Sequence, residues 1–314
     1  MRYVHSPFQS DGLWCDGDLY LPDNVDKPPV LIFVHGLGYP RFAGLMPFIC
    51  PLLTAGIAVY TFDFRNLTFS EGVLRNLIDP GEQVRDLHAA ITHMRALPEV
   101  DGERIGLCGV SVSAGHTMIT AAEDHQLAGI GCFIPCMDPK SYVLGRGVRF
   151  FLPLYLISLL DDISSHLGLS PICIPMKLPV YLFADCESPD FYPGYQIAWK
   201  RTGRKFGYDV LTLSLQQRAT GKHIVWTNLF PARSILRVLQ FQPQIAVPDV
   251  QCPALIIAAR DDSIVPYASV QSMAERFPEA ELVSYEGDHF ELGNHKELKE
   301  VVVDFFFRKF SENR

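Results

Sequence analysis

Residues 104–115, RIGLCGVSVSAG, decide the fold, because an apolar run typical of a buried strand meets a small-residue helix at a serine. Such a sharp strand-to-helix turn holds the serine hydroxyl exposed above the sheet and requires small residues two positions to either side. Gly109 meets this requirement, and Ser113 replaces the second glycine of the common Gly-x-Ser-x-Gly pattern. Ser111 is therefore the candidate nucleophile. The alternative is an ordinary turn in which this serine caps the helix.

A nucleophilic serine needs a histidine base and a carboxylate that orients it, in the chain order Ser, Asp, His. The strand-like run PALIIAA is followed by two acids, of which Asp262 is the candidate and Asp261 an alternative. Asp138, which follows an earlier strand, is a further candidate acid. His289 alone among the ten histidines lies on a strand-end loop after both Ser111 and the acidic pair, so it is the candidate base.

A glycine-containing loop follows another predicted strand in VLIFVHGLG, residues 30–38. Glycines let the backbone turn so that the amide of Leu37, together with the amide of Val112, can donate to a developing oxyanion. We therefore predict an oxyanion hole from these two amides, with a simple glycine-rich turn as the alternative. His35 is expected to be a structural hydrogen-bonding residue of the loop.

Short apolar runs alternate with helical patterns between residues 30 and 134, which is typical of a parallel sheet covered by helices. Residues 30–34 and 57–62 are predicted strands, and residues 80–98 carry one apolar stripe at helical spacing. The alternation resumes from Pro253 to the final helix. The predicted class is α/β with a mostly parallel central sheet.

The rhythm breaks between these two parts into proline-punctuated, aromatic-rich sequence, which we interpret as an inserted helical cap. Its most apolar run is residues 148–160, VRFFLPLYLISLL, in which Phe151 and Tyr155 are candidate substrate-binding residues. A helix packed on the core is the alternative for this run. The predicted organisation is a core formed by residues 1–137 and 248–314, with a cap formed by residues 138–247.

Composition excludes several classes of function. The 314 residues include 27 Lys and Arg against 35 Asp and Glu, and this net charge of −8 disfavours a nucleic-acid protein. The first 22 residues lack the apolar stretch of a signal peptide, and the 13-residue run above is shorter than the roughly 20 residues of a membrane span. Eight scattered cysteines predict reduced thiols in a cytoplasmic protein, without disulfides, metal or cofactor.

Four longer strings resemble a known family: DFRNLTFSEG, residues 78–116, AARDDSIVP and EGDHFELG. The chain resembles the α/β hydrolases, in particular the dienelactone-hydrolase-like and acyl-peptidase-like group that includes polyketide-releasing thiohydrolases and polyketide acyl transferases. The similarity covers nearly the whole chain and implies the α/β-hydrolase fold. Ala259 and Asn66 depart from glycines frequent in the group, and Asp63 and Arg65 resemble a structural ion pair at a strand end.

Three functions are compatible with these residues. The leading hypothesis is a cofactor-independent serine hydrolase that cleaves an ester or thioester of a mainly apolar acyl group, free or carrier-bound, through an acyl-enzyme. Acyl transfer to an alcohol or amine would use the same residues. A non-catalytic ligand-binding protein on the same fold is the third hypothesis, and the intact Ser, Asp, His set argues against it.

Overall fold

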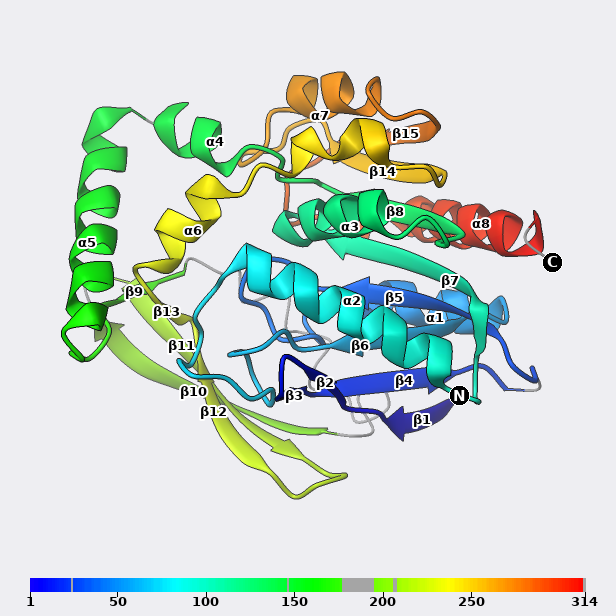
Figure 1. Ribbon diagram of the computed structural model, residues 1–314, viewed down its shortest axis with the longest axis horizontal. Helices are drawn as coiled ribbons and strands as arrows, with labels where there is room; N and C mark the ends of the chain where they lie inside the picture. The colour runs from blue at the N-terminus through cyan, green and yellow to red at the C-terminus, as the bar shows by residue number, and fades with distance from the viewer. Residues whose placement is uncertain (24, 146, 177–194, 206–207, 313–314) are drawn as a thin grey trace.

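The computed structural model describes residues 1–23, 25–145, 147–176, 195–205 and 208–312. Its centre is an eight-stranded sheet (Figure 1), in which two antiparallel pairings at one edge are followed by parallel pairings throughout. The strands lie in the order β1 (Arg2–His5), β4 (Gly17–Leu21), β6 (Ala58–Phe62), β5 (Pro29–Val34), β7 (Asp101–Val110), β8 (Gly129–Phe133), β14 (Ala254–Ala259) and β15 (Ala280–Tyr285). The mostly parallel sheet confirms the predicted fold class.

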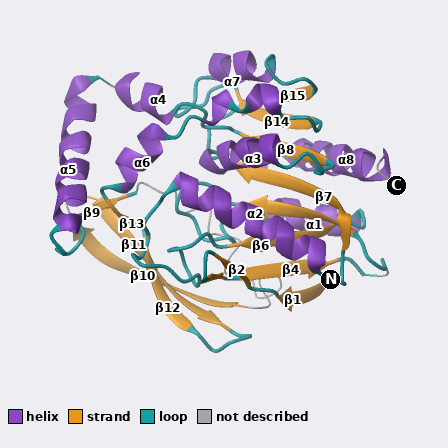
Figure 2. Ribbon diagram, viewed as in Figure 1, coloured by secondary structure: helices purple, strands orange, loops and turns teal. Residues whose placement is uncertain are grey.

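Helices cover both faces of this sheet, as Figure 2 shows. One face carries α2 (Pro80–Ala96), α3 (Val112–Glu123) and α7 (Tyr267–Ala274), and the other carries α1 (Met46–Thr54) and α8 (Lys296–Glu312). All six residues of β5 and all six of β14 are buried, which is the reason these strands are continuous apolar runs in the sequence. The expected central strands and crossover helix are therefore present close to their predicted positions.

The chain between the adjacent strands β8 and β14 leaves the core and covers the ends of the sheet (Figure 1). It contains the helices α4 (Pro139–Gly145), α5 (Val148–His166) and α6 (Ser234–Gln240). It also contains the paired strands β9 (Cys173–Pro175) and β13 (Leu229–Pro231) and a three-stranded antiparallel sheet of β10 (Tyr195–Lys205), β11 (Tyr208–Gln217) and β12 (His223–Thr227). We expected a helical cap, so this sheet is a correction.

The cap segment ends in two short 3₁₀ helices, η2 (Pro243–Ile245) and η3 (Val247–Asp249), and η4 (Leu292–Asn294) precedes the final helix. A small hairpin of β2 (Phe8–Ser10) and β3 (Leu13–Cys15) lies against α2. The domain boundaries at 137/138 and 247/248 stay a prediction. None of the helices in the described ranges is long and apolar enough to cross a membrane.

A buried ion cluster joins the N-terminal strands to the core. Arg41 is fully buried and donates to the carboxylates of Asp16, Asp18 and Asp63, with 2.7 Å between its Nε and the nearer oxygen of Asp18. Gln217 of β11 donates its amide to Asp16 at 2.8 Å, so the cap sheet reaches the same cluster. Buried charges are stable only when they are paired in this way.

The expected pairing of Asp63 with Arg65 is wrong. Asp63 is bound by Arg41, whereas Arg65 donates its Nε to Asp86 of α2 at 2.8 Å. The two side chains are two residues apart near the end of one strand, but each bonds to a partner from another element. Sequence proximity was a poor guide because the partners come from distant segments that only the fold brings together.

Candidate active site

Ser111 occupies a strained turn between β7 and α3. Its φ of 56° and ψ of −118° lie in a region that residues other than glycine rarely adopt, and its amide donates to the carbonyl of Phe133 in β8 at 2.8 Å. A Cβ at Gly109 would lie 2.2 Å from the carbonyl oxygen of Ser113, so only glycine fits there. The turn therefore has the geometry expected of a nucleophile elbow.

His289 and Asp262 complete a hydrogen-bonded chain with this serine. The Nε2 of His289 lies 3.0 Å from the Oγ of Ser111, and its Nδ1 lies 2.8 Å from the Oδ2 of Asp262. The other oxygen of Asp262 accepts the amides of Ile264 and Val265 at 2.8 and 2.7 Å. The carboxylate is thus fixed by two backbone donors, so it can hold the imidazole with Nε2 toward the serine.

The two alternative acids lie elsewhere. Asp261 is exposed and its amide bonds to the carbonyl of Gly287, while the carboxylate of Asp138 accepts the amide and hydroxyl of Ser141 at the start of α4. No hydrogen bond between either side chain and His289 is present in the described part of the chain. The structure therefore brings Asp262, rather than Asp261 or Asp138, to the histidine.

The two amides predicted to form an oxyanion hole come from segments that meet at the serine, Leu37 from the loop after β5 and Val112 from the start of α3. A Cβ at Gly36 would contact the Cβ of Ser111 at 3.7 Å, which places the loop of Leu37 against the elbow. Val112 is the first residue of α3, so its amide has no acceptor within the helix. Across the described residues, neither amide has another hydrogen-bond acceptor. Both remain available to a ligand oxygen.

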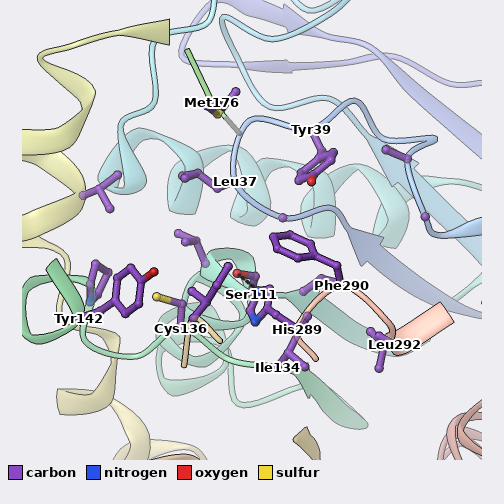
Figure 3. Close-up of a pocket in the computed structure, with 18 of the residues that line it drawn as sticks. Leu37, Tyr39, Ser111, Ile134, Cys136, Tyr142, Met176, His289, Phe290 and Leu292 are labelled. Carbon is purple, nitrogen blue, oxygen red and sulfur yellow. Dashed lines mark hydrogen bonds between the residues drawn. The ribbon is translucent and has the colours of Figure 1, made fainter. Parts of the chain in front are cut away.

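A pocket of about 450 Å³ opens over Ser111 and His289 (Figure 3). Its floor comes from the strand-end loops of the core, and its roof comes from α4, α5, α6, β9 and β13 of the cap. Figure 3 shows Cys136 and Tyr142 on one side of the serine and Tyr39 and Phe290 on another. The other lining residues labelled in Figure 3 are Leu37, Ile134, Met176 and Leu292.

No Lys, Arg, Asp or Glu is among the described residues that line this pocket. The cap contributes Tyr142, Phe150 and Met176, but not the expected Phe151 or Tyr155. Adjacent residues of a helix point about 100° apart, so Phe150 reaches the pocket while the other two rings stack on each other at 5.5 Å. Within the predicted run, Phe150 rather than Phe151 or Tyr155 thus lines this pocket, and a substrate-binding role for the latter two stays a prediction.

Two buried histidines lie behind the elbow. The Nδ1 of His35 bonds to the carbonyl of Gly36 at 2.7 Å, which confirms its expected structural role. His116 packs between the rings of Phe64 and Phe241, with centroids 5.4 and 5.0 Å away. Burial lowers the pKa of His35 to about 4 and that of His116 to about 3. Both are therefore neutral near pH 7. Among the described residues, the histidine that bonds to Ser111 is His289.

The free energy of unfolding is expected to fall as the pH decreases below about 6.5, the usual histidine pKa. In that range the unfolded chain protonates His35 and His116 whereas the folded chain does not, so protons favour unfolding. Each histidine contributes a slope of at most about 1.4 kcal/mol per pH unit. Urea unfolding at several pH values should show a shallower slope for His116→Gln and an unchanged slope for the exposed control His125→Gln. Equal slopes in all three proteins would contradict this prediction.

The comparisons with known proteins agree with this architecture. A family model described as the alpha/beta hydrolase family matches residues 31–301. The chain belongs to the alpha/beta hydrolase family. Among solved structures, that of the DcsB complex with its substrate analogue superimposes on this hydrolase with a TM-score of 0.76, at 21% identity and over 100% of both chains. That likeness supports the fold.

Relatives of this hydrolase carry several functional names. The quorum-quenching protein AidA of Acinetobacter baumannii is 30% identical over 95% of this chain and 91% of its own length. Thiohydrolase aneE of Aspergillus aculeatus is 40% identical over 36% of this chain and 34% of its own. Polyketide transferase af380 of Aspergillus fumigatus is 25% identical over 93% of this chain and 92% of its own. The predicted resemblance to the hydrolases, thiohydrolases and polyketide transferases is confirmed.

Proposed function

We propose that this hydrolase cleaves a carboxylic ester or thioester of a mainly apolar acyl group through an acyl-enzyme on Ser111. The observation that carries the proposal is the hydrogen-bonded chain from Ser111 through His289 to Asp262, which opens into an uncharged pocket. Three groups with these roles are what nucleophilic acyl chemistry requires. The proposal needs no cofactor.

The first half-reaction forms the acyl-enzyme. The Oγ of Ser111 attacks the substrate carbonyl carbon while Nε2 of His289 takes the hydroxyl proton, and Asp262 stabilises the imidazolium. The negative charge that develops on the carbonyl oxygen is held by the amides of Leu37 and Val112, which have no competing acceptor among the described residues. The leaving alcohol or thiol then departs with the proton from His289.

The second half-reaction returns the free enzyme. Water gives a proton to His289 and attacks the acyl carbon, and Ser111 recovers its proton as the acid is released. A second candidate function is acyl transfer, in which an alcohol or amine takes the place of water. The relative named polyketide transferase supports this candidate. Hydrolysis and transfer would proceed through the same acyl-enzyme and differ only in the acceptor.

The choice of an apolar acyl group rests on the pocket. Its walls are aliphatic and aromatic over most of their extent, and the polar side chains among its described lining residues are uncharged or belong to the proposed catalytic groups. A charged acyl chain would lose its hydration without gaining a partner of opposite charge. An apolar chain instead gains free energy by leaving water.

The test is to measure the intact mass of the protein after incubation with a panel of acyl thioesters and p-nitrophenyl esters. We expect the protein mass to increase by one acyl group on Ser111, and the adduct to decay in water. Faster decay with an added alcohol or amine, together with the corresponding acylated product, would assign acyl transfer. An unmodified protein that turns over none of the panel would overturn the proposal.

Activity is expected to rise with acyl chain length until the chain fills the pocket. Each buried methylene contributes up to about 0.8 kcal/mol, or roughly fourfold in kcat/KM. Phe150→Ala should shift the preferred length upward because Phe150 lines the pocket, whereas the matched control Phe151→Ala should leave it unchanged. The profile of kcat/KM against chain length measures this. A flat profile, or equal shifts in both variants, would contradict the assigned role of Phe150.

A further inference from the structure

Helix α5 exposes an unusual number of large apolar side chains. Eight of them, 37 to 72% exposed, are Val148, Leu152, Tyr155, Leu156, Leu159, Leu160, Ile163 and Leu167. They follow helical spacing from the first residue of α5 to the residue that caps its C-terminus, so they share one side of the helix. We call these eight residues the α5 face.

The inner side of the same helix is the more polar one. The buried residues of α5 are Ser158 and Asp161, and Asp161 accepts the Nε of Arg233 at 2.8 Å and the amide of Ile172 at 2.6 Å. Figure 1 shows α5 at the edge of the molecule, with α4 and α6 on its inner side. A surface helix normally turns its apolar stripe toward the core and its polar side chains toward water. α5 departs from this pattern, because the large apolar side chains of its outer side stay exposed in the described structure.

The spacing of the face suits a second helix of the same kind. Val148, Leu152, Tyr155 and Leu159 follow one another at intervals of four, three and four residues, which is the seam spacing of packed helix pairs. Large side chains at such positions interlock with those of a facing helix. Because one seam can pack against a copy of itself, the pattern is self-complementary under a twofold axis.

We propose that the α5 face is the surface through which two copies of this chain pair about a twofold axis. A half-exposed large apolar side chain presents on the order of 100 Å², so eight present about 800 Å², which is the area per partner of a standard stable interface. Monomeric proteins rarely expose apolar patches this large. Pairing face to face places the centre of the α5 face, near Leu156 and Leu159, beside the axis.

A lipid surface is the other occupant to consider, and the charges of α5 disfavour it. Helices that lie on membranes carry a polar face rich in Lys and Arg. The charged residues of α5 are Arg149, Asp161 and Asp162, of which Asp161 is used by the buried contact with Arg233. The remaining pair is neutral overall and offers no cationic rim for lipid headgroups.

The pairing would also affect the pocket. Phe150 belongs to α5 and lines the pocket, so a second copy that packs on the outer side of the helix would hold this wall in place. An effect of pairing on catalysis rests on the proposed function, whereas the pairing itself does not. The pairing itself is tested without any substrate, so its failure and that of the proposed function are distinguishable.

Sedimentation velocity of the whole chain at micromolar concentration tests the proposal. We expect a species of twice the 35.2 kDa chain mass, and dissociation to monomer in the double variant Leu152→Glu, Leu159→Glu. The matched control is Val73→Glu, since Val73 is 96% exposed and lies outside α5. Circular dichroism and thermal unfolding check that each variant is folded. A wild-type monomer, or a dimer that persists in a folded double variant, would overturn the proposal.

Disulfide cross-linking gives a second measurement that does not depend on destabilising the interface. Leu159→Cys lies near the proposed axis and should form a covalent dimer on mild oxidation, whereas Val73→Cys should give no more dimer than wild type, whose Cys50 and Cys173 are also exposed. Equal yields from the two variants would contradict the proposal. So would wild-type monomers that bind phosphatidylcholine vesicles containing phosphatidylserine, with binding abolished by the double variant.

Discussion

Ser111→Ala is expected to lower kcat/KM for ester or thioester cleavage by about 10⁴-fold or more, because it removes the nucleophile on which the acyl-enzyme forms. Its hydroxyl lies 3.0 Å from Nε2 of His289, and no other hydroxyl among the described residues bonds to that nitrogen. A fluorophosphonate probe should label Ser111 in the wild type and give no adduct in the variant. The intact mass and the rate of p-nitrophenyl ester hydrolysis measure both effects.

The matched control for this prediction is Ser113→Ala. Ser113 is also a serine of the elbow, but it is buried and its Oγ lies 3.3 Å from His116 rather than at His289. Its replacement should leave probe labelling intact. Labelling that persists in Ser111→Ala, or that is lost only in Ser113→Ala, would refute Ser111 as the nucleophile.

Asp262→Asn should lower kcat by about 10⁴-fold with little change in KM, because an amide favours the wrong tautomer of His289 and cannot stabilise the imidazolium. The substitution keeps an oxygen that can still accept the amides of Ile264 and Val265. The loop should therefore keep its shape. Steady-state kinetics, together with thermal unfolding to confirm the fold, measure the effect.

The controls are the two acids that the sequence also offered. Asp261→Asn changes an exposed carboxylate, and Asp138→Asn changes one that bonds to Ser141. Both should retain kcat within a fewfold of the wild type. A loss in Asp138→Asn comparable to that expected for Asp262→Asn would move the orienting acid to the other strand.

The core could be predicted from sequence because short stretches of sequence determine its strands and turns. β5 and β14 are fully buried, so their apolar runs are continuous, and the bends at Ser111 and Gly38 need residues that tolerate unusual φ values. The positions of Asp262 and His289 followed from the rule that parallel strands bring their carboxyl ends to one edge of the sheet. Chain order then limited the candidates to a few residues.

Other features depend on contacts that sequence patterns do not encode. The sequence carries little signal for helix α1, since Pro47 and Pro51 lie in it, although Pro47 stands in the first turn, where proline is tolerated. We did not predict the antiparallel sheet of the cap, because the elements that pack against such a sheet, rather than the hydrophobic period of its strands, decide which side is buried. That Phe150 rather than Phe151 lines the pocket could not be predicted for a similar reason, since large apolar residues occur around most of α5 and do not reveal which side faces the pocket.

The contact between Gln217 and Asp16 bears on how such caps can be exchanged between related chains. It joins residues 201 positions apart, and Gln217 is fully buried where it meets the carboxylate that Arg41 also holds. A transplanted cap without this amide would remove one of the two donors to Oδ2 of Asp16 in a low-dielectric site and leave that of Arg41. Chimeras should therefore take the N-terminal strands and the cap sheet from the same parent, because a buried hydrogen bond joins the two segments although they are far apart in the sequence.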